Sequence, residues 1–238
     1  WNRHCPRCWA SSAGLALWPL FIFTRCSRAI PRPRATRTTS TSSSTAAPPR
    51  RTAPAIFWAK ARRTPSTSWP RTRRGLVTFG ADVIAIPCNT AHYFYDRLNE
   101  TIPIPILNMV EETVLAAKAG GSARVGILAT TGTVRTRTYQ RMCEKHGLPC
   151  AVPDDAAQAA VMDIIYGDIK QGRPANMDAF ERAAASLRAQ GCDRAILGCT
   201  ELSLIKRDEG LGAFYLDSME VLARNAILAF GKTPIGFD

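Results

Sequence analysis

The sequence predicts an α/β fold in which helices cover parallel sheets. From residue 82 onward, short apolar runs alternate with segments of helical periodicity, which is the pattern of strand–helix–strand units. Two of the apolar runs also end at a cysteine that is followed by polar residues. Ligands of open α/β sheets bind at the carboxyl ends of the strands, so the same pattern predicts where a functional site lies.

The expected elements follow one another in a regular order. Apolar runs typical of buried parallel strands occupy residues 82–87, 105–108, 124–129, 194–198 and 213–216. Helical patterns occupy residues 92–99, 110–118, 133–146, 155–170 and 177–189. A shorter helix is expected to begin near Glu201.

Two cysteine motifs stand directly after predicted strands. The first is Pro-Cys-Asn-Thr-Ala-His at residues 87–92, and the second is Gly-Cys-Thr-Glu at residues 198–201. The polar residues after each thiol can offer hydroxyl, amide and backbone N–H groups to a carboxylate. A helix that begins beside each motif favours an anion at its N-terminus, which can lower the pKa of a thiol and hold a substrate carboxylate.

A simpler interpretation of these cysteines is also open. The chain has eight cysteines, and a buried free cysteine is commonly a small apolar filler. Cys143, Cys150 and Cys192 are expected to be inert, because none of them has such polar neighbours at a strand end. Cys88 and Cys199 differ from those three because their motifs repeat one design in two halves of the chain.

From about Gly75 to its end, the chain resembles the aspartate/glutamate racemase superfamily, and within it the aspartate racemases. Besides the two cysteine motifs, the resemblance rests on residues 104–113, on the turn at residues 128–133, and on the segment 164–170 with its Tyr-Gly pair and lysine. Glutamate racemases carry a histidine after the second Cys-Thr, whereas this chain has Glu201. Some broad-specificity relatives have threonine where this chain has Cys88. Aspartate racemases are therefore the most similar group.

The resemblance implies a cofactor-independent mechanism in which Cys88 and Cys199 face opposite sides of the substrate Cα. One thiolate removes a proton and the other thiol returns one, because a single base would tend to return the proton to the face it left. Without an organic electron sink, preorganised donors must stabilise the charge that develops on the α-carboxylate. Which thiol is the resting base stays open. The candidate donors by position are Asn89, Thr90, Thr131 and Thr200.

Three further side chains are placed near the two motifs. By resemblance, Lys170 lies near the side-chain carboxylate of the substrate, the alternative being a solvated lysine after a helix. His92 and Glu201 can each tune the neighbouring thiol or cap the local helix, and capping is favoured for His92. The chain has three histidines, no Cys-x-x-Cys pair in its globular part and no phosphate loop, so neither a metal nor a cofactor is expected.

Residues 1–74 differ in composition from the rest of the chain. They contain no Asp or Glu but 15 of the 31 Lys and Arg residues, together with all five tryptophans. The remaining residues therefore have 16 basic against 19 acidic side chains, a net charge of −3. The charge of +12 on the whole chain thus comes from this segment, and the body gives no reason to expect nucleic-acid binding.

Three explanations of residues 1–74 are considered: a transit peptide, a basic nucleic-acid-binding arm, and translation in a shifted frame. When G/C-rich codons for residues 8–24 are read in a shifted frame, they spell a glycine loop of the racemase type. Residues 36–42 and those from 51 onward likewise come to resemble the N-terminal half of that family. We therefore infer a frameshift close to Arg74. Our hypothesis is that the chain with the present residues 1–74, here called the written chain, is poorly active or inactive.

The resemblance implies two similar lobes related by a pseudo-twofold axis, with the site in the cleft between them. Residues 75–119 with 217–238 are expected to be the remnant of the first lobe, which carries Cys88. Residues 120–216 are expected to form the second lobe, which carries Cys199. Residues 1–74 are expected to be an aberrant, disordered, low-complexity segment that leaves the first lobe incomplete.

The expected partner is a small-molecule amino acid, and a homodimer is what the resemblance implies. No body segment approaches the roughly 18 consecutive apolar residues of a membrane span, so no membrane partner is expected. Free catalytic thiols fit a reducing compartment, which favours the cytoplasm. The rival functions are a related carbanion-forming isomerase or decarboxylase, an inactive product, and a basic-arm binding protein.

Overall fold

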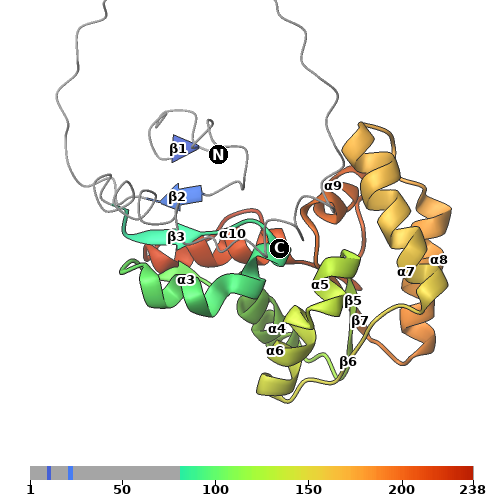
Figure 1. The fold of residues 1–238 in the computed structure, drawn as a ribbon, viewed down its shortest axis with the longest axis horizontal. Coiled ribbons are helices and arrows are strands. Elements are labelled where there is room, and N and C mark those ends of the chain that lie inside the picture. The colour runs from blue at the N-terminus through green and yellow to red at the C-terminus, as the bar shows by residue number, and fades with distance from the viewer. Residues whose placement is uncertain (1–9, 12–20, 24–80, 238) are drawn as a thin grey trace, which may run out of the picture. The chain divides into compact units, whose positions relative to one another are not determined.

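The computed structural model describes residues 10–11, 21–23 and 81–237. Its strands are β1 Ala10–Ser11, β2 Phe21–Phe23, β3 Val83–Ala85, β4 Ile106–Leu107, β5 Val125–Leu128, β6 Cys150–Ala151, β7 Arg194–Leu197 and β8 Tyr215–Asp217. Its α-helices are α3 Tyr95–Thr101, α4 Met109–Ala119, α5 Thr131–Arg135, α6 Thr138–His146, α7 Asp155–Met162, α8 Met177–Ala189, α9 Thr200–Glu209 and α10 Ser218–Ala229 (Figure 1). Three other helical segments are the 3₁₀ helices η2 Asn89–Phe94 and η4 Ile169–Gln171 and the π-helix η3 Asp163–Asp168.

The second sheet is parallel throughout. Its strand order is β6-β5-β7-β8, and each neighbouring pair runs in the same direction. All four residues of β5 are buried, as a parallel strand covered on both faces requires. The predicted α/β class is therefore confirmed. Strand β6 was not predicted, because two residues are too few to establish a period.

The first sheet is mixed. Strands β3 and β4 are parallel, with Ile84 opposite Ile106, whereas β2 pairs with β3 and β1 pairs with β2 in the antiparallel sense. The sequence predicted only parallel pairing here. Without β2, β3 would be an edge strand, whose unpaired backbone groups an extended segment can meet in either direction. Apart from β1 and β2, residues 1–74 lie outside the described residues, so the frameshift and the disorder of that segment stay predictions.

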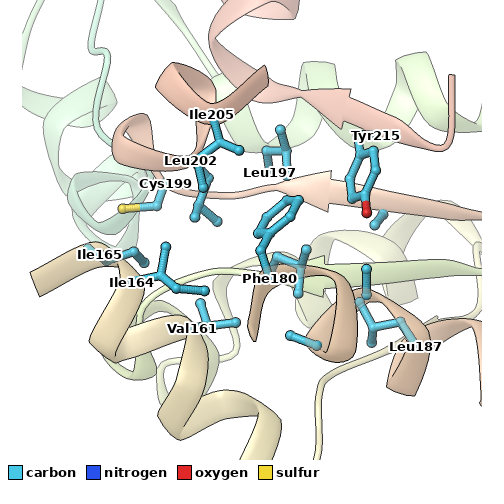
Figure 2. Close-up of a cluster of buried hydrophobic side chains, with 14 of the residues drawn as sticks. Val161, Ile164, Ile165, Phe180, Leu187, Leu197, Cys199, Leu202, Ile205 and Tyr215 are labelled. Carbon is cyan, nitrogen blue, oxygen red and sulfur yellow. The ribbon is translucent and has the colours of Figure 1, made fainter. Parts of the chain in front are cut away.

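Helices cover both faces of the second sheet, because alternate residues of its central strands point to opposite sides. Leu128 and Leu197 belong to a cluster with side chains of α7, α8 and α9. Figure 2 shows this cluster, in which Phe180 of α8 lies between the sheet and the neighbouring helices. Ile127 and Ile196 belong to a second cluster with side chains of α4 and α6. The central strands are thus shielded on both sides, and their carboxyl ends are held in fixed positions.

Two helical segments differ from the predicted ranges. The predicted helix at 133–146 is divided into α5 and α6, because Arg137 between them has a left-handed backbone with φ 54°. The predicted helix at 155–170 continues as a helical run but changes at Asp163 from α to π and then to 3₁₀ geometry. The helix expected from His92 begins three residues earlier, at Asn89, as a 3₁₀ helix.

Helix α10 returns to the first sheet after β8. It packs against α4, β3 and β4, and its Leu222 forms a buried cluster with Ala85 and Met109. Asn225 of α10 also donates a hydrogen bond to Glu112 of α4 at 2.7 Å. Within the part of the chain that the structure describes, no helix is both long and apolar enough to cross a membrane.

Replacing Gly126 by alanine tests how closely α8 approaches the sheet. A Cβ at this position of β5 would lie 2.5 Å from Cδ1 and 3.0 Å from Cβ of Leu187. We expect Gly126→Ala to lower the free energy of unfolding by about 1–3 kcal/mol, measured by urea denaturation. The control is Gly212→Ala, where no atom lies within 4 Å of the added Cβ. Equal urea midpoints for the two variants would contradict the close approach.

Candidate active site

The two cysteines occupy the same local geometry in the two sheets. Cys88 follows the end of β3 by three residues and immediately precedes η2, with an extended backbone of φ −152° and ψ 107°. Cys199 follows the end of β7 by two residues and immediately precedes α9, with φ −148° and ψ 138°. Each thiol therefore stands at the carboxyl end of a parallel strand and at the N-terminus of a helix, which is the arrangement that the motifs predicted.

His92 holds the Cys88 segment against α4. Its Nδ1 lies 2.9 Å from the carbonyl oxygen of Cys88, and its Nε2 accepts a hydrogen bond from the backbone N–H of Met109 at 3.1 Å. Nε2 is thus an acceptor, so the proton of the neutral ring is on Nδ1 and is donated to Cys88. Burial lowers the pKa of His92, which favours this neutral form. His92 does act as a cap, but for the first turn of α4 instead of its own helix.

Both polar atoms of the Asn89 side chain are bonded to other parts of the protein. Its Oδ1 accepts a hydrogen bond from the Tyr139 hydroxyl at 2.5 Å, and its Nδ2 donates to the Ser218 hydroxyl at 3.1 Å. The next residue, Thr90, has its hydroxyl 2.9 Å from that of Thr133. The side chain of Asn89 is therefore engaged within the fold, and the donor left for a ligand is its backbone N–H.

Cys199 belongs to a charged cluster. Its Sγ donates to Oε2 of Glu201 at 2.8 Å, and the Thr200 hydroxyl donates to the same oxygen at 3.1 Å. Lys170 lies 2.9 Å from the other carboxylate oxygen of Glu201, and its Nζ is 4.8 Å from the centre of the Tyr166 ring. Four residues that the sequence singled out are thus brought together: Cys199, Thr200, Glu201 and Lys170.

The cluster keeps Glu201 ionised and Cys199 protonated. Burial alone would raise the pKa of Glu201, but the hydrogen bonds from Cys199 and Lys170 outweigh it and lower that pKa. Burial raises the pKa of the Cys199 thiol well above its usual value, and the negative charge of Glu201 raises it further. In the free site, Cys199 is therefore a thiol that points its proton at a carboxylate.

The same charged pair acts on Cys88. Burial raises the pKa of Cys88, and the backbone N–H groups of Ala91 and Thr90 oppose this change. Beyond these local effects, Glu201 raises the pKa of Cys88 and Lys170 lowers it. Since Glu201 and Lys170 also shift the pKa of Cys199, the two thiols share one electrostatic environment although they come from different sheets.

The start of α5 contributes two threonines beyond the predicted donors: Thr130, which caps the helix, and Thr133 in its first turn. Thr133 is fully buried and lies between the hydroxyls of Thr90 and Thr130, at 2.9 and 3.1 Å. The predicted Thr131 has other neighbours, because its N–H donates to Met162 Sδ at 3.2 Å and its hydroxyl accepts from Gln158 at 3.4 Å. Thr130 and Thr133 are three residues apart, a spacing that places two side chains on the same face of a helix, and this spacing is visible in the sequence.

A depression of about 380 Å³ lies along α9, beside the charged cluster of Cys199, Glu201 and Lys170. Its lining does not include either cysteine, so we do not assign the reacting atoms of a substrate to it. In Figure 2 the sulfur of Cys199 points away from Phe180 and Leu197. The residues that line the depression are Thr200, Glu201, Ser203, Leu204, Arg207 and Met219.

Comparison with known proteins identifies the family. The model of the Asp/Glu/hydantoin racemases matches residues 26–226, which is most of the chain. The chain belongs to the Asp/Glu/hydantoin racemase family. The superfamily that the cysteine motifs predicted is therefore confirmed.

Individual racemases match over part of their length. The chain is 27% identical over 152 residues to the glutamate racemase of Shewanella loihica, covering 62% of the chain and 56% of that enzyme. It is 26% identical over 151 residues to the broad-specificity amino-acid racemase RacX of Bacillus subtilis, covering 63% of the chain and 66% of that protein. The chain thus spans roughly half to two thirds of the length of these curated racemases.

Solved structures of the family share the fold. A candidate Asp/Glu racemase of Yersinia pestis superposes with a TM-score of 0.66 at 28% identity, covering 75% of this chain and 79% of that one. The aspartate racemase of Picrophilus torridus superposes with a TM-score of 0.59 at 25% identity, covering 76% and 77% of the two chains. These relatives include an aspartate racemase, a glutamate racemase and a broad-specificity amino-acid racemase. The comparisons therefore identify the family but not the substrate.

Alkylation of the two thiols tests the effect of the Lys170–Glu201 pair. Because the charge of Glu201 raises the pKa of Cys199 and of Cys88, Glu201→Gln should lower both and increase the thiolate fraction at pH 8. Lys170→Met should have the opposite effect. We expect alkylation by iodoacetamide, measured for each cysteine by peptide mass mapping, to become at least threefold faster at Cys199 in the first variant and slower in the second.

The control for this experiment is Glu181→Gln. Glu181 also accepts a hydrogen bond from a hydroxyl, that of Tyr215, and pairs with a cation, Arg188, but it lies on α8. This change should leave both alkylation rates within about twofold of the unmodified protein. The same direction of change in Glu201→Gln and Lys170→Met would show that loosened structure, instead of charge, controls the thiols.

Proposed function

We propose that the protein is a cofactor-independent racemase of an acidic amino acid, in which Cys88 and Cys199 exchange protons with opposite faces of the substrate Cα. The observation that carries this proposal is the repeated strand, cysteine and helix arrangement, whose two thiols both lie in the field of Lys170 and Glu201. A reaction that inverts one carbon needs two proton-transfer groups of similar acidity on opposite sides of it.

The first chemical requirement is a thiolate. Both thiols have raised pKa values in the free site, so one proton must leave before either sulfur can act as a base. Glu201 is the acceptor already in contact with the Cys199 thiol. At the other thiol, the N–H groups of Ala91 and Thr90 favour the anion. The α-ammonium group of a bound amino acid would add positive charge beside both sulfurs and favour their thiolates further.

The second requirement is stabilisation of the carbanion. Removal of the Cα proton places negative charge on the α-carboxylate, and preorganised N–H and O–H donors stabilise such charge best. The backbone N–H groups that begin η2 and α9 stand directly after the two cysteines. We assign the α-carboxylate to this pair of helix starts, with Thr90 and Thr200 beside them. The Thr200 hydroxyl donates to Glu201 in the free site and would turn from it to the carboxylate. The Asn89 side chain is bonded elsewhere, so its part is limited to its backbone N–H.

The third requirement is recognition of the substrate side chain. Lys170 is partly exposed, with 36% of its side chain accessible, and it is held by Glu201 and the Tyr166 ring. An ammonium group in this position can receive a carboxylate on the substrate side chain. We therefore propose aspartate as the substrate, supported by Glu201 in the place where glutamate racemases carry histidine. Glutamate is the alternative that the experiment below must separate.

Deuterium exchange at Cα tests the proposed chemistry. In D₂O the protein should incorporate deuterium at Cα of L-aspartate and form D-aspartate, and both rates should be higher than with L-glutamate. Cys88→Ser and Cys199→Ser should each reduce racemisation at least a hundredfold, because a serine hydroxyl is far less acidic than a thiol. NMR for deuterium content and chiral chromatography for the product provide the two measurements.

Cys192→Ser is the matched control for these variants. Cys192 is a buried free cysteine that packs in the cluster between the second sheet and α8, and it precedes β7, whereas Cys199 follows that strand. Racemisation should persist in this variant. Equal loss in all three serine variants would mean that the changes act through stability, and exchange with neither amino acid would overturn the substrate assignment.

The hypothesis about residues 1–74 has its own test. The written chain is compared with a version in which residues 1–74 are replaced by the translation of the shifted frame. We expect the replaced version to racemise aspartate at least tenfold faster, because it regains the glycine loop and the N-terminal half of the first lobe that the resemblance implies. Equal activity of the two proteins would show that the written segment is sufficient and that the frameshift inference is wrong.

A further inference from the structure

We infer that Tyr139 and Ser218 are positioning residues for the Cys88 loop, here defined as residues 88–92, and that they act through the side-chain amide of Asn89. Neither residue belongs to the cysteine motifs, and neither contacts a sulfur atom directly. The inference deepens the proposed function and depends on it for its catalytic meaning. Its test is chosen so that it does not depend on catalysis.

Four polar groups form a continuous chain of hydrogen bonds. The Tyr139 hydroxyl donates to Asn89 Oδ1 at 2.5 Å, and Asn89 Nδ2 donates to Ser218 Oγ at 3.1 Å. The Ser218 hydroxyl donates to the carbonyl oxygen of Leu197 at 2.7 Å. Leu197 ends β7 two residues before Cys199. The chain therefore links the loop that carries Cys88 to the strand that leads to Cys199.

The hydrogen-bonding capacity of these groups allows the bonds to run in one donor-to-acceptor direction only. A serine hydroxyl has a single proton, and that of Ser218 is directed to Leu197 O, so its oxygen must accept from the NH₂ group of Asn89. The amide oxygen of Asn89 then faces Tyr139, whose hydroxyl has to donate. Burial raises the pKa of Tyr139, so this phenol retains the proton that the chain requires.

Because the bonded groups are buried, breaking any of these hydrogen bonds is unfavourable. Tyr139 and Ser218 are both 0% exposed, and Asn89 is 2% exposed, so water cannot replace a lost partner without rearrangement. A buried acceptor that loses its donor has given up water without a replacement, which is destabilising. The amide of Asn89 would regain water by moving toward solvent, and because Asn89 is adjacent to Cys88, the thiol would move with it.

The remaining bonds of the loop do not replace this chain. His92 and Ala91 hold the carbonyl oxygen of Cys88, and Thr90 is held by Thr133 of α5. Among the side-chain hydrogen bonds of residues 88–92, all of which the structure describes, those of Asn89 alone reach both α6 and α10. Loss of the Tyr139 hydroxyl should therefore loosen the loop on the side where Cys88 meets the second lobe.

The test compares the reactivity of two cysteines within one molecule. In Tyr139→Phe and, separately, in Ser218→Ala, the rate of alkylation of Cys88 by iodoacetamide at pH 8 is measured by peptide mass mapping, with Cys199 as the internal reference. We expect the ratio of the Cys88 rate to the Cys199 rate to rise at least threefold in each variant, because the loop that partly buries Cys88 is loosened. Circular dichroism records the melting temperature of each protein.

Tyr215→Phe is the matched control. Tyr215 is also a buried tyrosine with a hydrogen-bonded hydroxyl, but its partner is Glu181 of α8. Tyr215→Phe should lower the melting temperature to a similar extent as Tyr139→Phe and leave the ratio of the Cys88 rate to the Cys199 rate unchanged. An unchanged or lower ratio in Tyr139→Phe, or an equal rise in Tyr215→Phe, would overturn the inference.

Deuterium exchange on the same proteins separates this inference from the proposed function. If the unmodified protein exchanges the Cα proton of aspartate, Tyr139→Phe should lower kcat at least tenfold and change KM less than threefold. If the unmodified protein exchanges neither aspartate nor glutamate, the proposed function fails while a risen alkylation ratio still supports the positioning role. An unchanged kcat in Tyr139→Phe would overturn that role for catalysis.

Discussion

The geometry of the site depends on how the loop after Cys88 is fastened to the rest of the fold. Three polar side chains in this loop bind four helices: Asn89 binds α6 and α10, Thr90 binds α5, and His92 binds the start of α4. A loop that lies partly in the interior must satisfy its polar groups there, since water has limited access. The same bonds that satisfy them fix the orientation of the thiol.

The Lys170–Glu201 pair gives the two thiols a common electrostatic control. Glu201 is the more enclosed partner, with 18% of its side chain exposed against 36% for Lys170. Burial is the main cause of the raised pKa of Cys199, Glu201 raises that pKa further, and Lys170 opposes the change only in part. A carboxylate on a ligand would compete with Glu201 for Lys170. Under the proposed function, ligand binding and thiol acidity would therefore be coupled through this lysine.

Much of the fold followed from local patterns, and the errors occurred where distant partners decide the structure. Apolar runs located the parallel strands of the second sheet, and the strand-end rule placed both cysteines at the starts of helices. The left-handed Arg137, which divides one predicted helix, carries no such signal, because a non-glycine residue in that conformation is uncommon. The antiparallel β1 and β2 were equally hidden, since an exposed sheet edge does not specify its partner.

In the candidate site, too, local patterns identified residues, whereas contacts between distant residues were not predicted. Sequence motifs supplied Cys88, Cys199, Glu201 and Lys170, but spacing could not predict that Glu201 contacts both Cys199 and Lys170. The partners of Asn89 lie 50 and 129 residues away in the sequence, on α6 and α10. Asn89 therefore looked like a ligand-binding amide, although its side chain bonds within the protein. A motif shows which groups are present, whereas only the fold shows which of them are already occupied.

The two halves of the site are alike in backbone and different in chemistry. Both cysteines have extended backbones and precede a helix, and backbone N–H groups oppose the raised pKa of each, but the Cys199 thiol also donates a hydrogen bond to a carboxylate. The racemisation of a free amino acid has an equilibrium constant of one, so kcat/KM must be equal in the two directions whatever the pKa values of the thiols. In the proposed mechanism each thiol acts as a base in one direction and as an acid in the other, so thiols of similar acidity serve both directions best. Lys170 and Glu201 act on both sulfurs and could bring the two acidities together.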